Sequence, residues 1–143
     1  MKKLFLLVAG LMIGGLAQAG DMMVNVGQLP QPVKAFVSEH FPKQKISYAL
    51  LDKDLFSTKY ELTLDNATEI EITPKGEWLE IDGRKNPVPD TIVPAGIIQY
   101  VKVNAGGVYI REIKRKGYGY EVELSGGLEL KFNKKAEFLR LDD

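Results

Sequence analysis

Cysteine is absent from this chain, and histidine occurs once, as His40. Without cysteine there are no disulfide bonds, no thiolate nucleophile and no lipid-anchored N-terminal cysteine. A single histidine excludes paired nucleophile-base arrangements and most zinc or copper sites. The four serines lie in no strand-turn-helix motif that activates a nucleophile. We therefore expect a protein that is not an enzyme and that has no cofactor and no metal site.

An excess of charge of one sign is also missing, since Lys and Arg together number 19 and so do Asp and Glu. Loss of Lys2 and Lys3 with a leader would leave 17 basic residues against 19 acidic ones, a net charge of about −2. Proteins that bind nucleic acid or an anionic membrane surface are strongly basic. We therefore expect no nucleic-acid partner.

No apolar run is long enough to cross a bilayer, because residues 4–16 fall short of the ~20 residues required. This run follows Lys2-Lys3 and precedes Ala17-Gln18-Ala19, which is the order of a secretory signal peptide. We expect cleavage after Ala19, export to the periplasm and no membrane insertion afterwards. The remaining 124 residues are enough for one compact domain.

The most informative feature that is present is a repeat, since residues 60–82 recur at residues 120–142 without a gap. The segment YELTL becomes YEVEL, and EWLEID becomes EFLRLD. Two copies of a unit too small to bury its apolar face alone are expected to share one sheet and one core. We assign residues 1–19 to the signal peptide, 20–83 to the first repeat and 84–143 to the second.

Each repeat is predicted to begin with a helix and to continue as strands. The first helix follows Pro30, ends before Pro42 and has an apolar face formed by Val33, Phe36, Val37 and Phe41. The second follows Pro94 and has Ile97, Tyr100 and Val101. Beyond each helix, apolar and polar residues alternate, as in half-buried antiparallel strands. The expected fold is α+β, a tandem α-β-β-β-β unit whose helices pack on one face of a shared antiparallel sheet.

The alternation also assigns the two faces of that sheet. The residues expected to face the helices are Leu62, Leu64, Ile70, Ile72, Leu79, Ile81, Val122, Leu124, Leu130, Phe132, Leu139 and Leu141. The residues expected on the open face are Trp78, Phe138, Glu61, Glu69, Glu71, Glu80, Glu121, Glu123, Glu129, Lys131 and Arg140, joined by Tyr109 and Arg111 if Ile110 points inward. Near residues 52–57 the first copy has about four extra residues, which indicates a longer hairpin loop.

Three motifs give the chain a family resemblance. They are L/V-P-x-x-V/I at residues 29 and 93, Y-E-[LV]-x-L at residues 60 and 120, and [GA]-E-[WF]-L-x-[IL]-D at residues 76 and 136. Duplicated behind a signal peptide, they resemble the PepSY-like periplasmic proteins, whose fold is similar to that of the β-lactamase-inhibitor protein. The resemblance implies this fold over nearly all of the mature chain. It implies no inhibitory residues, because no inhibitor motif is present.

Aromatic side chains among charges suggest a recognition surface, since Trp and Tyr dominate interface energetics while charges set specificity. We therefore expect a non-enzymatic protein, inhibitor-like in its mode of action, that binds a protein or peptide of the cell envelope through the open face. Equally, the glutamates are typical of any solvated sheet, with Trp78 and Phe138 packing locally across it. The alternative function is a structural or stress-related envelope protein that self-associates through sheet edges. A hydrolase that uses paired carboxylates such as Glu69 and Glu71 is the third possibility.

Overall fold

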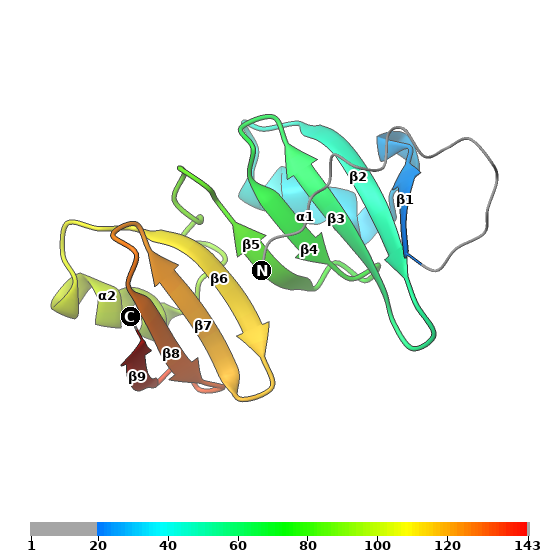
Figure 1. Ribbon diagram of the computed structural model, residues 1–143. Helices are drawn as coiled ribbons and strands as arrows, with labels where there is room; N and C mark the ends of the chain where they lie inside the picture. The colour runs from blue at the N-terminus through cyan, green and yellow to red at the C-terminus, as the bar shows by residue number, and fades with distance from the viewer. Residues whose placement is uncertain (1–19, 143) are drawn as a thin grey trace. The chain divides into compact units, whose positions relative to one another are not determined.

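The computed structural model describes residues 20–142 (Figure 1), so the expected signal peptide lies outside the described residues. Within that part of the chain the elements are β1 (Gly20–Val24), η2 (Val26–Gln28), α1 (Gln31–His40), β2 (Ile46–Lys53), β3 (Thr58–Leu64), β4 (Glu69–Ile72), β5 (Trp78–Asp82), α2 (Ala95–Asn104), β6 (Ile110–Lys116), β7 (Gly119–Leu124), β8 (Glu129–Asn133) and β9 (Phe138–Asp142). The nine strands described form one antiparallel open sheet in chain order, which confirms the mixed α+β class. Strand β1 and the 3-10 turn η2 were not predicted.

The chain divides into two compact units. Unit 1 comprises the described residues up to Asp65 together with Ile70–Trp78, and unit 2 comprises Asn66–Glu69 and the described residues from Leu79 onward. Most of β5 therefore belongs to unit 2, although its sequence lies in the first repeat. A common face for the two helices remains a prediction.

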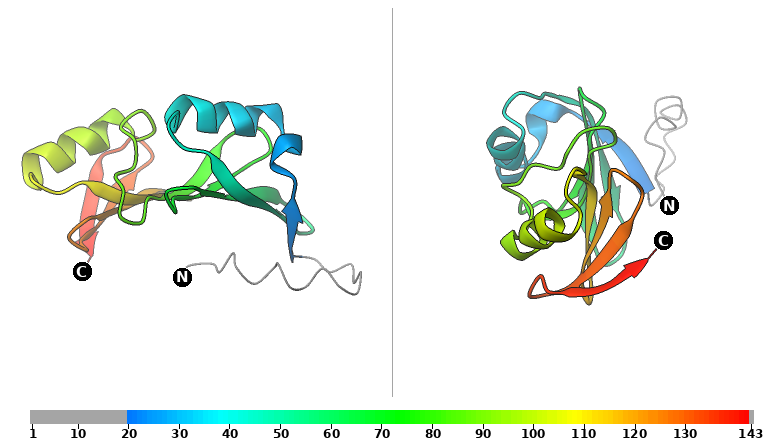
Figure 2. Two further views of the ribbon diagram at one scale, coloured as in Figure 1. Left: turned by 90° about the horizontal axis from the view of Figure 1, so that it is seen from above. Right: turned by 90° about the vertical axis from the view of Figure 1, so that its left-hand side faces the viewer.

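In unit 1, α1 lies over one face of the strands (Figure 2). The helix begins after Pro30 and ends at His40, two residues before Pro42, as the sequence predicts. Its buried residues are Val33, Phe36 and Val37. The strands contribute buried Ala49, Leu62 and Leu64. The predicted helical periodicity thus forms this core.

In unit 2, α2 follows Pro94 and buries Ile97 and Val101. Its Tyr100 ring meets the Phe132 ring edge-on with centroids 5.6 Å apart, and it stacks on Phe138 at 4.4 Å. Figure 2 shows α2 over one face of the unit 2 strands. The buried strand residues of this core are Ile113, Val122, Leu124, Leu130 and Phe132.

The predicted burial of the last strand is wrong. Leu139 is 47% exposed and Leu141 is 49% exposed. The reason is that β9 is the last strand in the order of the described sheet and is hydrogen-bonded there only to β8, so no strand of the described residues covers its other side. Leu79 is half-buried. The remaining nine residues assigned to the helix side are buried.

A close backbone approach joins the first turn of α2 to the turn between β8 and β9. A methyl group added at Gly96 would lie 2.9 Å from the carbonyl oxygen of Ala136, closer than real Cβ atoms come. At an open helical position, Gly→Ala stabilises by about 0.5–1 kcal/mol. We expect Gly96→Ala instead to lower the free energy of unfolding by about 1 kcal/mol or more, because the added methyl overpacks the contact.

Denaturant unfolding of Gly96→Ala beside Gly126→Ala checks this contact. A methyl group at Gly126 meets no atom within 4 Å, so that variant should stay within ~0.5 kcal/mol of wild type. A Gly96→Ala protein that is more stable than wild type would show that the approach is not tight.

Candidate functional site

Two rows of charged residues cross the strands of unit 2 on the face opposite Ile81 and Ile113. Each row runs across β5 to β9, because the register sets its members opposite one another. The alternating row is Glu80, Lys114, Glu121, Lys131 and Arg140. The acidic row is Asp82, Glu112, Glu123, Glu129 and Asp142. Neighbouring strands lie ~4.8 Å apart, so the five carboxylates of the acidic row follow one another at close spacing.

Like charges directly opposite one another destabilise a sheet, so the acidic row needs cations. A β-bulge in β6 supplies the first. The register shifts between Ile110 and Glu112, so Arg111 is the extra residue and lies on the same face as Glu112. Its guanidinium contacts Glu123 Oε1 at 2.7 Å and Asp82 Oδ1 at 3.1 Å, and it also reaches Glu112. The hydrogen bond to Glu123 raises the pKa of Arg111.

Lys131 supplies the second cation, from the alternating row. Its Nζ lies 2.6 Å from Glu121 Oε2, 3.3 Å from Asp142 Oδ2 and 3.8 Å from Glu129 Oε1. The hydrogen bond to Glu121 raises the pKa of Lys131. Burial has the largest single influence on Glu121 and raises its pKa, but the hydrogen bonds from Lys131 and Tyr118 and the positive charges nearby together outweigh burial, so the pKa of this carboxyl group is lowered. The Tyr118 hydroxyl donates to Glu121 Oε2 at 3.1 Å, and the Lys131 Nζ lies 5.8 Å from the centre of the Tyr118 ring.

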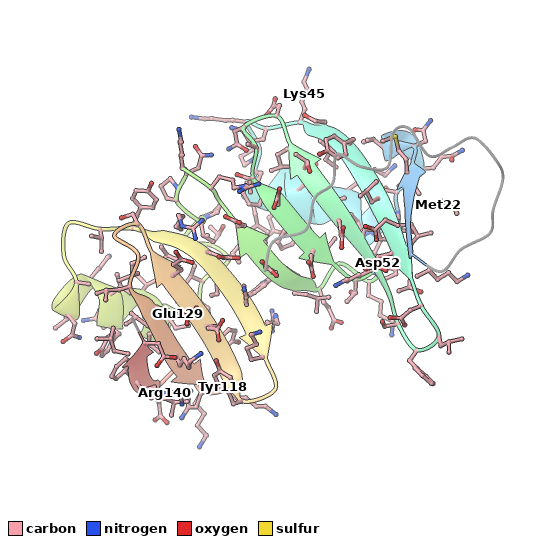
Figure 3. The ribbon with its side chains drawn as sticks, in the orientation of Figure 1. Met22, Lys45, Asp52, Tyr118, Glu129 and Arg140 are labelled. Carbon is pink, nitrogen blue, oxygen red and sulfur yellow. The ribbon has the colours of Figure 1, made fainter. Side chains whose placement is uncertain are left out.

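Figure 3 shows Glu129 on the side of unit 2 that faces the viewer, with α2 behind the strands. Arg140 and Tyr118 lie toward the lower end of the same unit. Tyr118 is an aromatic residue that is 40% exposed and contacts the alternating row through its hydrogen bond to Glu121. We call the two rows together with Arg111 and Tyr118 the charged face.

Glu112 is an acid of the charged face whose pKa is strongly shifted. Burial, a hydrogen bond with Glu80 and the charge of Asp82 raise its pKa to about 8. Lys114, 4.0 Å away, acts in the opposite direction. The folded protein therefore binds a proton at Glu112 that the unfolded chain, at an ordinary pKa of 4.5, releases. The stability from this group is complete below pH 4.5 and is lost as the pH rises toward about 8.

We expect Glu112→Gln to flatten the fall in unfolding free energy between about pH 5 and about pH 8, because glutamine cannot ionise. Denaturant unfolding across this range measures the effect. Glu121→Gln is the control of opposite sign, since a lowered pKa contributes stability above the ordinary value that is lost as the pH falls. If wild type and Glu112→Gln show parallel profiles, Glu112 ionises normally in the folded protein.

Six of the charged residues expected on the open face lie together in the charged face with Arg111. They are Glu80, Glu121, Glu123, Glu129, Lys131 and Arg140. The other three acids are separate. Glu71 pairs with Lys59 at 2.9 Å, Glu69 pairs with Arg84 at 3.0 Å, and Glu61 is fully buried.

The aromatic part of the predicted surface is wrong. Phe138 faces α2, because a register shift in β9 sets it opposite buried Phe132 and against Tyr100. Trp78, its equivalent in the repeat, is only 6% exposed, so it is no exposed anchor; a large ring is costly to leave in water. Tyr109 donates its hydroxyl to the Lys85 carbonyl and lines a pocket of about 150 Å³ beside Val88.

Asp82, Glu112, Asp142 and Tyr118 were not predicted. Asp82 and Asp142 follow Glu80 and Arg140 at a spacing of two, so strict alternation could have included them. Strict alternation from Ile110 assigns Glu112 to the helix side. The extra residue Arg111 shifts the alternation by one position, so Glu112 lies on the charged face instead. Tyr118 lies in the turn before β7, where alternation gives no assignment.

Two further features of unit 1 lie outside the predicted set. Carboxylate oxygens of Asp21, Asp52 and Glu61, on β1, β2 and β3, lie within 4.8 Å of one another. At the tip of the β2–β3 hairpin, Leu55 is 91% exposed and Phe56 is 95% exposed. Asp54 accepts hydrogen bonds there from the backbone of Phe56 and Ser57, which lower its pKa. This is the hairpin that the sequence predicts to be longer in the first copy.

Comparison with known proteins agrees with the fold and the compartment. The profile of the family described as "Putative beta-lactamase-inhibitor-like, PepSY-like" matches residues 18–73 and 58–140. No curated protein matches the chain. Among the residues that the structure describes, none of the helices is long and apolar enough to span a bilayer.

Three crystal structures of Bacteroides proteins are similar to this chain. A "putative calcium-regulated periplasmic protein" of Bacteroides thetaiotaomicron is 34% identical, with a TM-score of 0.81 over 86% of this chain and 97% of the other. A periplasmic protein of unknown function from Bacteroides vulgatus ATCC 8482 is 39% identical, with a TM-score of 0.80 over 87% and 100%. A periplasmic protein of the DUF2874 family from the same strain is 33% identical, with a TM-score of 0.80 over 86% and 97%.

These proteins have one location in common. All three are described as periplasmic, and each match covers most of both chains. This chain is accordingly an exported, periplasmic protein, as its N-terminal residues predict. The family profile and the structural similarity together show that the chain belongs to the PepSY-like, β-lactamase-inhibitor-like family of periplasmic proteins.

Proposed function

We propose that this protein is a non-enzymatic periplasmic binding protein that recognises the basic surface of a protein or peptide through the charged face. The observation that carries the proposal is the acidic row, which sets five acidic side chains in register across five strands. The family description and the neighbours of unknown function are compatible with a non-enzymatic role. If the partner is an enzyme, this binding would act as inhibition.

The balance of charge sets the chemistry of the partner. The two rows and Arg111 contain seven acidic and four basic residues, so acids are in excess even with Glu112 protonated. Arg111 and Lys131 neutralise the centre, while the carboxylates of Glu129 and Asp142 are 37% and 38% exposed. Lysine or arginine side chains of a partner can therefore reach the outer carboxylates without displacing the inner ion pairs.

Tyr118 replaces Trp78 and Phe138 as the proposed aromatic anchor. Its ring is exposed, and its hydroxyl is fixed by Glu121. A ring held in one orientation loses little conformational freedom on binding, and tyrosine is enriched among residues that dominate interface energies. Truncation of a true hot spot costs at least ~2 kcal/mol of binding free energy.

Capture from periplasmic extract, with two matched variants, tests the proposal. The face variant is Tyr118→Ser with Glu129→Gln and Asp142→Asn. The control is Glu39→Gln with Asp65→Asn, which removes the same number of charges from exposed positions outside the charged face. A partner retained by wild type and control and lost by the face variant supports the proposal. A partner retained equally by all three proteins rules out this face.

A second candidate function is calcium-dependent regulation. One neighbour is described as calcium-regulated, and Asp21, Asp52 and Glu61 offer oxygen ligands of the kind that calcium prefers. Ligands on opposite sides of a bound calcium ion lie ~4.8 Å apart, so the grouping fits the ion, with further oxygens needed. Calcium should raise the melting temperature of wild type and not of Asp52→Asn. A wild-type melting curve that calcium leaves unchanged would remove this candidate.

The remaining alternative is a structural or stress-related envelope protein that self-associates through sheet edges. Exposed apolar residues at both ends of the strand order favour it, namely Met22 and Met23 in β1 and Leu139 and Leu141 in β9. This alternative needs no partner other than a second copy.

A further inference from the structure

The pocket beside Tyr109 lies wholly in unit 2, between the second half of α2, the segment before that helix and the start of β6. Buried Val88, Val101 and Ile110 line it, together with Val108 and Tyr109, which are 36% and 37% exposed. The pocket is therefore largely apolar and open to solvent. It shares no residue with the charged face.

The volume of the pocket suits a single apolar ring. An apolar cavity of about 150 Å³ holds one benzene molecule, and this pocket has the same volume. A phenyl group that enters it leaves water for an apolar surface, which is the main favourable contribution to such binding. The size therefore sets the ligand group at about six carbon atoms.

Backbone and side-chain hydrogen bonds form the pocket before any ligand binds. The Tyr109 hydroxyl donates to the Lys85 carbonyl oxygen at 2.9 Å, and the Tyr109 backbone N–H donates to Ser125 Oγ at 3.2 Å. The Val88 N–H donates to the Ile110 carbonyl oxygen at 2.9 Å. These bonds hold the segment before α2 against the start of β6. A ligand thus loses little of its binding energy to ordering the protein.

The repeat identifies the equivalent positions in unit 1. Helices α1 and α2 have ten residues each and begin at residues 31 and 95. The hydrogen bond from the Ser125 N–H to the Tyr109 carbonyl oxygen repeats the one from Asp65 to Lys45. Three apolar residues that line the pocket therefore correspond to polar residues of the first copy, namely Ile98 to Lys34, Val108 to Gln44 and Tyr109 to Lys45.

This comparison shows that the fold does not need an apolar lining at these three positions. Unit 1 forms the same helix and the same following strand with two lysines and a glutamine there. Single exposed apolar residues need no explanation, but here three gather around one pocket. A preformed apolar pocket with a few polar groups is the usual form of a small-ligand site.

Two opposite charges line the same pocket. Asp90 and Lys102 are both exposed, and neither forms an ion pair with another residue that the structure describes. A free carboxylate and a free ammonium group beside an apolar pocket complement a ligand that has one apolar group and both charges. At neutral pH an amino acid with an apolar side chain has these three groups.

We propose that this pocket binds an amino acid with a phenyl-sized side chain, whose ammonium group pairs with Asp90 and whose carboxylate pairs with Lys102. The amino acid is free or forms the end of a peptide chain, where it keeps one of its two charges. About a dozen non-hydrogen atoms take part, so we expect a dissociation constant of about 1 mM. The site shares no residue with the charged face, so it stands independently of the proposed function.

NMR titration of the mature protein with L-phenylalanine up to ~10 mM tests the site, a range set by the expected weak binding. The amide signals of Val108 and Tyr109 should shift and saturate. The pocket variant, Ile98→Lys with Val108→Gln, places first-copy residues in the pocket and should bind at least tenfold more weakly. The control, Leu128→Lys with Val103→Gln, makes the same kinds of change at exposed positions outside the pocket and should bind as wild type. Absence of saturation, or equal binding by the two variants, would overturn the proposal.

Recognition of the two charges is tested by Asp90→Asn with Lys102→Gln. Both side chains are exposed, so this variant should fold as wild type and bind L-phenylalanine at least threefold more weakly, the scale of exposed ion pairs. Benzyl alcohol has the same ring without a charge, so it should bind wild type more weakly than L-phenylalanine does. It should bind this variant as it binds wild type. Equal binding of the two compounds to wild type would show that the charges are not recognised and would contradict the proposal.

Two tripeptides distinguish the sources of the ligand. If only free L-phenylalanine binds, the site takes a free amino acid. Binding of phenylalanyl-glycyl-glycine identifies the N-terminus of a peptide, whose ammonium group Asp90 would hold. Binding of glycyl-glycyl-phenylalanine identifies a C-terminus, whose carboxylate Lys102 would hold. A pocket that binds none of the three would rule out the site.

Discussion

Replacing Phe132 with alanine should lower the free energy of unfolding by about 3–5 kcal/mol. The ring is fully buried, and it meets Tyr100 of α2 and Phe138 of β9 edge-on at 5.6 and 5.9 Å. Its loss removes buried apolar area and leaves a cavity among three elements that cannot all move together. Denaturant unfolding followed by circular dichroism measures the change.

Leu141→Ala is the matched control for this prediction, because Leu141 occupies the neighbouring strand and is half exposed. Its cost should be below ~1 kcal/mol in the monomer, as for most exposed substitutions. A Phe132→Ala protein with the same stability as Leu141→Ala would show that the α2 core does not form around this ring.

Replacing Lys131 with methionine should lower the free energy of unfolding by about 2–3 kcal/mol at neutral pH, because it leaves carboxylates without their cation. Lys131 is 8% exposed and faces Glu121, Glu129 and Asp142. Glu121 loses the hydrogen bond that lowers its pKa. The deficit should shrink in acid, where the carboxylates are protonated.

Lys114→Met is the control, since the Lys114 ammonium lies 4.0 Å from a carboxylate oxygen of Glu112, a longer separation than the 2.6 Å between Lys131 and Glu121. Its effect should be within about 1 kcal/mol, the usual range for a partly exposed ion pair. If the two variants are equally stable at pH 7 and pH 4, the charged face is not held together by Lys131.

The sequence was sufficient to predict both helices and most of the buried residues. Helical spacing identified Val33, Phe36 and Val37, and alternation identified Leu62, Leu64, Val122 and Leu124. Both patterns come from local geometry that every residue of an element obeys. The repeat added the prediction that the two helices have equivalent positions before their strands.

Two kinds of information were missing from the pattern. Each bulge, at Arg111 and near Leu139, inserts one extra residue and so shifts the alternation between the two faces. Glu112 therefore lies on the charged face, and Phe138 lies on the helix side, each opposite to what strict alternation predicts. The acidic row depends on which residue lies opposite which, and Asp82 and Asp142 are 60 positions apart in the chain. Periodicity within one strand cannot specify such cross-strand neighbours.

Calorimetry with the purified captured protein measures whether the charged face binds a basic partner. The dissociation constant should be at least tenfold weaker for the Tyr118→Ser, Glu129→Gln, Asp142→Asn variant than for the Glu39→Gln, Asp65→Asn control. Binding of wild type should also weaken as the ionic strength rises, because the attraction is between opposite charges. Equal affinity of the two variants, independent of salt, would contradict the assignment of this face.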